Sequence, residues 1–318
     1  MRILTSIALI LTIVAAPAAP AAAAAQAACT WRVTALPAPA GYSYAVANGV
    51  APVSGTVVGH AVRADGSGRD AVVWQNGSPQ VLPKPPIEGS GSNRADIVNN
   101  QGVIAGVWWG ANNRVTAWRY RAGTYDLLPM PATTMGISVT GINTAGDIIG
   151  QSFTLSPSSQ GLLWKAATPD QYTSLGSSTY AVGIDDAGRY VLNTRVIVNP
   201  DGSRVTLARQ VFVRLYDRGR ILTDDLDKKT VVEWNISGQV VREFAGTYGH
   251  AVNASGVLVA TPPGTAYVAV RNGSAWEQFT VRMTTSEGIT DANVVVANFD
   301  HDGTTQTEQV AGTWQRGC

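Results

Sequence analysis

A short pattern of apolar and polar residues recurs along most of the chain. Its clearest copy is residues 141–150 (GINTAGDIIG), where an apolar residue precedes Asn-x-x-Gly and a second Gly follows four residues later. Asn at the first position of a turn bonds the backbone two residues on, and Gly is favoured at the fourth position. Each copy therefore predicts a tight reversal between two strands.

Six copies of this turn are found in the sequence. They begin at Asn48, Asn99, Asn143, Asp185, Asn253 and Thr290. The first is irregular, because four extra residues precede the Gly55-x-x-x-Gly59 spacing. In the sixth, Asn293 replaces Gly, and Asn is the next best residue for a left-handed backbone. The turns thus divide the chain into repeat units.

Each unit has a second half, an apolar run that ends in Trp, followed by a Gly turn and a strand ending in Leu-Pro or Leu-Gly. The Trp residues in this position are Trp74, Trp118, Trp164, Trp234 and Trp314, with Val270 in the same place in the fifth unit. A unit of four antiparallel strands cannot bury its faces alone, so units of roughly 40 to 50 residues must stack. We therefore expect an all-β, six-bladed propeller with these Trp side chains packed between blades.

The two ends of the chain complete one another. Residues 31–37 (WRVTALP) resemble a fourth strand without the preceding three, whereas the sixth unit stops after the third strand, at residues 314–318. We expect residues 30–37 to pair antiparallel with residues 310–317 and to close the last blade. This pairing places Cys29 beside Cys318, and it predicts a disulfide between them.

The turn motif, the Ala-apolar-apolar-Trp run and the Leu-Pro or Leu-Gly ending together resemble the HAF repeats of secreted bacterial proteins. The resemblance covers nearly the whole mature chain, and it implies a propeller-like ring. The His-Ala-Phe motif that names the family is not intact, since Gly59-His60-Ala61-Val62 and Gly249-His250-Ala251-Val252 match it only loosely. The family has no common activity that could be carried over to this chain.

The N-terminus reads as an export signal. A basic start, an apolar run and the small-x-small sequence Ala25-Gln26-Ala27 predict a signal peptide over residues 1–27 and a single secreted propeller domain over residues 28–318. The apolar run is shorter than a membrane span and is broken by prolines. Lipidation at Cys29 is the rival interpretation, although Gln26 stands where Leu is expected. Net charge +1 argues against a dedicated nucleic-acid surface, and we expect a monomer.

Two motifs are candidate sites. Trp108-Trp109 occurs in no other unit, and adjacent strand residues point to opposite faces, so one ring packs between blades while the other forms an exposed platform for a sugar or peptide, or packs at an edge. Asn298, Asp300 and Asp302 alternate before Gly303, like the start of a calcium loop. The alternative is an Asp-Gly hairpin, and no other cofactor is expected.

The fourth unit carries an insertion of arginine-rich sequence between Arg189 and Thr230, expected to form an added hairpin that serves as a solvated rim or a recognition arm. No Gly-x-Ser-x-Gly elbow or sialidase-type Asp box is present. The sequence therefore favours an extracellular binding or scaffold module for a glycan or protein of unknown identity. The alternative from another class is an extracytoplasmic glycan-active hydrolase or lyase.

Overall fold

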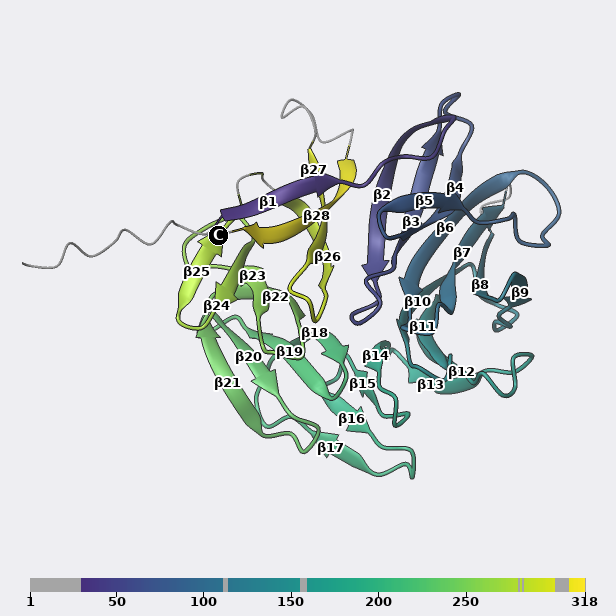
Figure 1. Ribbon diagram of the computed structural model, residues 1–318. Helices are drawn as coiled ribbons and strands as arrows, with labels where there is room; N and C mark the ends of the chain where they lie inside the picture. Colours follow the sequence, from purple (N-terminus) through teal and green to yellow (C-terminus); the bar gives the residue numbers. More distant parts are fainter. Residues whose placement is uncertain are drawn as a thin grey trace, which may run out of the picture.

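The protein folds as a ring of β-sheets around a central channel (Figure 1). The computed structural model describes residues 30–110, 114–154, 159–279, 281, 283–300 and 309–317. These residues form seven four-stranded antiparallel sheets, the blades of a propeller. No helix within these ranges is long and apolar enough to cross a membrane.

The blades follow the chain order, and each runs from the channel outward. Blade 1 is β2 (Tyr42–Val50), β3 (Val57–Arg63), β4 (Arg69–Gln75) and β5 (Ser78–Val81). Blade 2 is β6 (Gly91–Val98), β7 (Ile104–Gly110), β8 (Val115–Arg121) and β9 (Thr124–Leu127). Blade 3 is β10 (Gly136–Ile142), β11 (Ile148–Phe153), β12 (Gln160–Trp164) and β13 (Thr173–Ser177).

The second half of the ring has the same plan. Blade 4 is β14 (Ala181–Ile184), β15 (Tyr190–Leu192), β16 (Val196–Val198) and β17 (Arg204–Thr206). Blade 5 is β18 (Phe212–Asp217), β19 (Arg220–Asp225), β20 (Thr230–Trp234) and β21 (Val240–Ala245). Blade 6 is β22 (Thr247–Val252), β23 (Leu258–Thr261), β24 (Ala269–Asn272) and β25 (Ala275–Gln278). Blade 7 combines β26 (Met283–Ile289), β27 (Val295–Asp300) and β28 (Gln309–Gly317) with β1 (Thr30–Ala35).

The predicted turns form in five of the six copies. The exception is the first, because Asn48 lies inside β2 at a register shift, and the turn of blade 1 lies at residues 51–56, where the Ala51 N–H donates to Thr56 O. In blade 3 the Asn143 N–H donates to Asp147 O, the Gly146 N–H donates to Asn143 O, and the Asn143 side-chain oxygen accepts from the Asp147 N–H at 2.8 Å. Asn293, the substitute for Gly in blade 7, has φ +61°. A different constraint, the close approach of the neighbouring strand, explains the second Gly of the motif. A Cβ built on Gly150 would lie 2.0 Å from the Ser138 carbonyl oxygen, so only glycine fits beside the innermost strand.

The expected number of six blades is wrong, because the presumed insertion completes one blade and begins another. Residues 189–230 supply β15, β16 and β17 of blade 4 together with β18 and β19 of blade 5. Blade 4 ends its third strand in Val198, not Trp. In blade 5, β18 and β19 are joined at Arg218 and Gly219, whose φ values of +45° and +79° suit a two-residue hairpin turn. The tryptophan is therefore missing from blade 4, and the Asn-x-x-Gly turn is missing from blade 5. For this reason the sequence shows one unit where the structure has two blades.

The expected closure of the ring by the N-terminal strand is confirmed. β1 pairs antiparallel with β28 from Thr30↔Gly317 to Ala35↔Gly312. Trp31 is 2% exposed and packs in the core of blades 6 and 7. Cys29 and Cys318 lie outside the described residues, so the disulfide stays a prediction.

The repeat tryptophans form the core between blades, as expected. Trp74, Trp118, Trp164, Trp234 and Trp314 are at most 1% exposed, and each packs against residues of the preceding blade. The Trp74 Nε1–H donates to Pro37 O at 2.8 Å, and the Trp164 Nε1–H donates to Pro129 O at 2.7 Å. The Leu-Pro ending of one blade thus accepts a hydrogen bond from the next.

Candidate functional site

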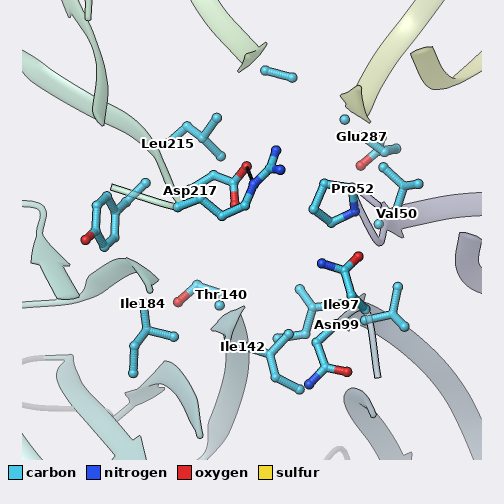
Figure 2. A pocket seen from close by; sticks show the side chains of 18 of the residues that line it. Val50, Pro52, Ile97, Asn99, Thr140, Ile142, Ile184, Leu215, Asp217 and Glu287 are labelled. Atoms are coloured by element: carbon cyan, nitrogen blue, oxygen red, sulfur yellow. Dashed lines mark hydrogen bonds and ion pairs between the residues drawn. The ribbon is translucent and has the colours of Figure 1, made fainter. Parts of the chain in front are cut away.

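The channel contains a partly open cavity of about 300 Å³ at the end where the first and second strands of each blade are joined, here called the turn mouth. Residues from all seven blades line it, and Figure 2 shows side chains from several of them converging on the same space. Among those labelled there are Val50, Thr140, Ile184, Asp217 and Glu287. The cavity is therefore a property of the whole ring.

Hydrogen bonds between neighbouring turns hold the turn mouth together. The Asn99 Nδ2–H donates to Asn143 O at 2.8 Å, from blade 2 to blade 3. The Thr144 N–H of blade 3 donates to Asp186 Oδ1 of blade 4 at 2.7 Å. Further bonds are Tyr216 Oη–H to Asp185, Arg220 to Ala254 O, Asn253 to Thr290 O, Asp291 N–H to Pro52 O, and Val53 N–H to Asn100. Such a ring fixes the shape of the entrance.

Arg218 links two blades that are not neighbours. Its guanidinium lies 3.0 Å from Asp217 in blade 5 and 2.7 Å from Asp291 in blade 7. The hydrogen bond from Arg218 lowers the pKa of Asp291, whereas burial raises the pKa of Asp217, which the charges of Asp291 and Asp186 raise further. Asp186, Asp217 and Asp291 are thus gathered at the entrance near two guanidinium groups, those of Arg218 and Arg220.

Near the turn mouth, the innermost strand of every blade carries a β-bulge, and the innermost strands of blades 1, 6 and 7 each carry a second register shift farther from the turn. The shift near the turn mouth lies at equivalent positions in all seven blades, and the bulged residues there are Asn48, Asp96, Thr140, Val182, Arg214, His250 and Glu287, here called the channel ring. A bulge adds a residue to one strand and redirects its side chain. Asn48, Thr140, His250 and Glu287 line the cavity, so the channel ring forms its inner end.

Burial sets the charge states of the channel ring. It raises the pKa of Asp96 to about 6, although the nearby Arg94 opposes this shift. It also raises the pKa of Glu287 to about 7; hydrogen bonds from Thr285 and Asn298 and the charge of Arg94 lower this value, and the charge of Asp96 raises it. Burial lowers the pKa of His60, the partner of Asn48, to about 3, so this imidazole is neutral.

Trp108 and Trp109 point into different interfaces, as the alternation of a strand predicts. Trp108 is 2% exposed and packs with residues of blades 1 and 2. Trp109 is half-buried against residues of blades 2 and 3, and the Arg94 guanidinium carbon lies 4.7 Å from the centroid of its ring. Neither ring belongs to the cavity lining. A platform on Trp109 stays a prediction.

Of the three residues expected to bind calcium, the structure describes Asn298 and Asp300. Asn298 is 1% exposed, and its amide bonds the backbone of Ala47 in blade 1. Asp300 is the last residue of β27, and Asp302 lies outside the described residues. No group of three or more His, Cys, Asp or Glu side chains suited to a metal occurs among the residues described. The calcium site therefore stays a prediction.

The channel ring was missed in the sequence, although a signal for it exists. Counted from the first residue of each turn, the position three residues earlier holds Asp96, Thr140, His250 and Glu287 in four blades. These polar residues interrupt runs that are otherwise apolar or small. The pattern can be recognised only when the innermost strands of all seven blades are aligned. Arg214 is not found by counting back from an Asn-x-x-Gly turn, because blade 5 has a two-residue turn instead.

No protein-family model matches the sequence, and no curated protein matches it significantly. Among solved structures, the fold is similar to one from a study of two prolyl endopeptidases, with a TM-score of 0.58 and 12% identity over 85% of this chain. A puromycin-hydrolysing peptidase of Mycobacterium tuberculosis has a TM-score of 0.51 and 11% identity over 83% of this chain. The matches cover 50% and 52% of those chains, so this chain spans about half the length of either protein. At such identity the likeness shows the propeller fold alone.

Proposed function

We propose that the protein is an extracellular binding module that holds its ligand in the central channel at the turn mouth. The observation that carries this proposal is the cavity, which side chains from all seven blades line. Clefts that combine apolar walls with a few convergent polar groups are the usual sites of ligand binding. Here Val50, Ile142 and Ile184 supply apolar walls, and the channel ring supplies donors and acceptors at the inner end.

The rigidity of the entrance supports recognition. The hydrogen bonds between turns hold the lining residues in place before a ligand arrives, and preorganisation of this kind reduces the entropy lost on binding. A ligand narrow enough to enter would be contacted from several blades at once. The signal peptide expected over residues 1–27 supports the proposal that this binding takes place outside the cytoplasm.

A glycan, peptide and small-molecule array tests the proposal when it is combined with a variant that fills the channel. Ile142→Trp adds bulk to the cavity wall, and Val240→Trp on the outermost strand of blade 5 is the matched control. We expect Ile142→Trp to lose the array ligands and Val240→Trp to keep them. Ligands that bind both variants as well as the parent protein would place the binding site elsewhere.

A second candidate, a glycan-active hydrolase or lyase, is favoured by one observation. Asp96 and Glu287 are two carboxyl groups of the channel ring whose pKa values burial raises to about 6 and about 7. A carboxylic acid with a raised pKa and a second carboxylate are the usual pair for glycoside hydrolysis. Release of reducing ends from an array glycan by the parent protein, with loss in Glu287→Gln, would favour the enzyme.

A further inference from the structure

Exposed aromatic side chains from blades 5 and 6 lie at the end of the channel opposite the turn mouth. The innermost strands begin at this end, here called the far mouth. β18 begins at Phe212 and β22 at Thr247, and the two strands lie side by side in the ring (Figure 1). Phe212 is 59% exposed, and Tyr248 is 51% exposed. The far mouth therefore presents two aromatic rings to solvent.

Arg214 links the two blades beside these rings. Its guanidinium carbon lies 5.2 Å from the centroid of the Tyr248 ring in blade 6. Its Nε–H donates to Asp224 Oδ2 at 2.5 Å, within blade 5. Asp224 is fully buried, and its Oδ1 accepts from the Gly249 N–H of blade 6 at 3.0 Å. The guanidinium is thus held in place by a buried carboxylate on one side and an aromatic ring on the other.

Phe212 points toward the same interface between blades. It lies directly opposite Asp224 in the register of β18 with β19, and the side chains of cross-strand partners share one face of a sheet. Because Asp224 reaches Gly249, this is the face of blade 5 that meets blade 6. The next residue, Val213, packs on the opposite face in the core between blades 4 and 5, as alternation requires. Phe212 therefore lies on the same side of blade 5 as the arginine–tyrosine pair.

The polar group that this cluster offers to a ligand is a donor. Within the described part of the chain, Nη1 and Nη2 of Arg214 donate no hydrogen bond, and the side chain is 38% exposed. A guanidinium anchored through Nε presents its two remaining nitrogens as a rigid planar fork. Both oxygens of Asp224 already accept hydrogen bonds inside the protein. The fork matches a planar carboxylate, whose two oxygens accept two parallel bonds.

The backbone of Tyr248 is strained. Its φ is +53°, in the left-handed region that is unfavourable for a bulky side chain. Tyr248 is the extra residue at the register shift between Thr247 and Gly249, and a bulge of this kind redirects a side chain. Glycine adopts the same conformation without this cost. An exposed aromatic ring retained in an unfavourable backbone conformation points to a role in binding rather than in folding.

Further exposed apolar side chains follow the far mouth on neighbouring blades. Met135 directly precedes β10, Phe153 ends β11 beside the start of β10, and Tyr180 directly precedes β14. They are exposed by 53%, 41% and 39%, respectively. Together with Phe212 and Tyr248 they occupy four consecutive blades. This distribution suits an extended chain that lies along the rim better than a single small molecule.

We propose that Phe212, Arg214 and Tyr248 bind a uronic acid residue of an acidic glycan at the far mouth. The carboxylate of the sugar accepts hydrogen bonds from the arginine fork. The C–H groups on the flat face of the sugar ring carry partial positive charge, so they pack against the negative face of an aromatic ring. None of the three residues lines the channel cavity. The site is therefore separate from the one in the proposed function and goes beyond it.

Isothermal titration at neutral pH with EDTA present tests the proposal. The probes are trimers of galacturonate and of mannuronate, their methyl esters, which keep the ring and lose the charge, and a tripeptide with a free carboxyl terminus. We expect saturable binding of at least one uronate trimer and binding of its ester that is weaker by about tenfold or more. Tyr248→Gly and Arg214→Lys should each weaken the binding of this trimer by about tenfold or more.

Matched controls separate these effects from general changes at the surface. Tyr172→Gly, on an exposed loop of blade 3, and Arg204→Lys, on the outermost strand of blade 4, should bind the trimer like the parent protein. Tyr248→Gly should melt close to the parent protein, because glycine relieves the positive φ of this position. A loss of binding in this variant then reports the missing ring rather than unfolding. Thermal melts measure the folding of every variant.

Several outcomes would overturn the inference. These are no binding of either trimer, equal binding of trimer and ester, binding that Tyr248→Gly leaves unchanged, and binding of the tripeptide that is as tight as that of the trimer. Ile142→Trp distinguishes the far mouth from the channel cavity, and it should bind the trimer like the parent protein. If Ile142→Trp abolishes binding of the trimer and Tyr248→Gly does not, the proposed function stands and the site at the far mouth fails.

Discussion

Asn298 and Ala47 exchange two hydrogen bonds across the seam where the last blade meets the first. The Asn298 Oδ1 accepts from the Ala47 N–H at 2.8 Å, and its Nδ2 donates to Ala47 O at 2.9 Å. The side chain thus pairs with the backbone of β2 as another strand would. Residues far apart in sequence are joined at the point where the ring closes.

Replacing Asn298 should destabilise this seam. Asn298→Ala leaves a buried N–H and a buried C=O of Ala47 without partners, and we expect a loss of about 2 to 4 kcal/mol in the free energy of unfolding. Asn272→Ala, at the exposed end of β24 in blade 6, should cost less than about 0.5 kcal/mol. Denaturant titration measures both. Equal losses would mean that the two bonds contribute nothing to closure.

The tryptophan bonds between blades offer a matched pair of variants. Trp164→Phe removes the donor to Pro129 O, whereas Trp118→Phe removes a buried Nε1–H for which no partner is found in the described residues. Both changes delete the same atoms from a similar interface. We therefore expect Trp164→Phe to cost about 1 to 3 kcal/mol more than Trp118→Phe in the free energy of unfolding. A larger loss for Trp118→Phe would contradict this explanation.

The carboxyl groups of the channel ring should make stability depend on pH. The folded-state pKa values of Asp96 and Glu287, about 6 and about 7, lie above ordinary values, so the folded protein binds more protons than the unfolded chain between about pH 4 and pH 7. Their contribution to stability is fully present below about pH 4 and is lost as the pH rises through the folded-state values. The charge of Arg94 acts on both carboxyl groups and opposes the rise in their pKa values. Burial lowers the pKa values of His60 and His250, and this changes stability with pH in the opposite sense.

Comparison with the double variant Asp96→Asn, Glu287→Gln isolates the carboxyl contribution, because the histidines are unchanged. We expect the melting temperature of the parent protein, relative to the variant, to fall between pH 4 and pH 8. Thermal melts across this range measure the difference. A difference that stays constant with pH would show that the two carboxyl groups titrate with ordinary pKa values.

The sequence predicts the local units of this fold better than their number. Asn143 and Gly146 specify a turn by local chemistry, and Trp164 marks the third strand because the next layer of the core requires a large apolar side chain. Blade 5 escapes detection because Arg218-Gly219 makes a different turn, and blade 4 because Val198 fills the tryptophan position. Closure by residues 30–37 was predictable, since an incomplete blade at each end leaves only one way to complete the ring.

The candidate site depends on relationships that a repeat pattern does not carry. From the sequence alone, Asp96 is one polar residue in a predicted strand. The direction of its side chain depends on a register shift of one residue between β6 and β7. Asn48, Asp96 and Glu287 lie on adjacent blades because the ring brings blade 7 beside blade 1. With the wrong number of blades, the neighbours across the channel could not be assigned.

Titration of a ligand selected on the array against the parent protein, Ile142→Trp and Val240→Trp tests the central claim most directly. The account predicts saturable binding to the parent protein and to Val240→Trp, and its loss in Ile142→Trp, whose side chain lines the channel cavity. Equal binding to all three proteins would contradict it.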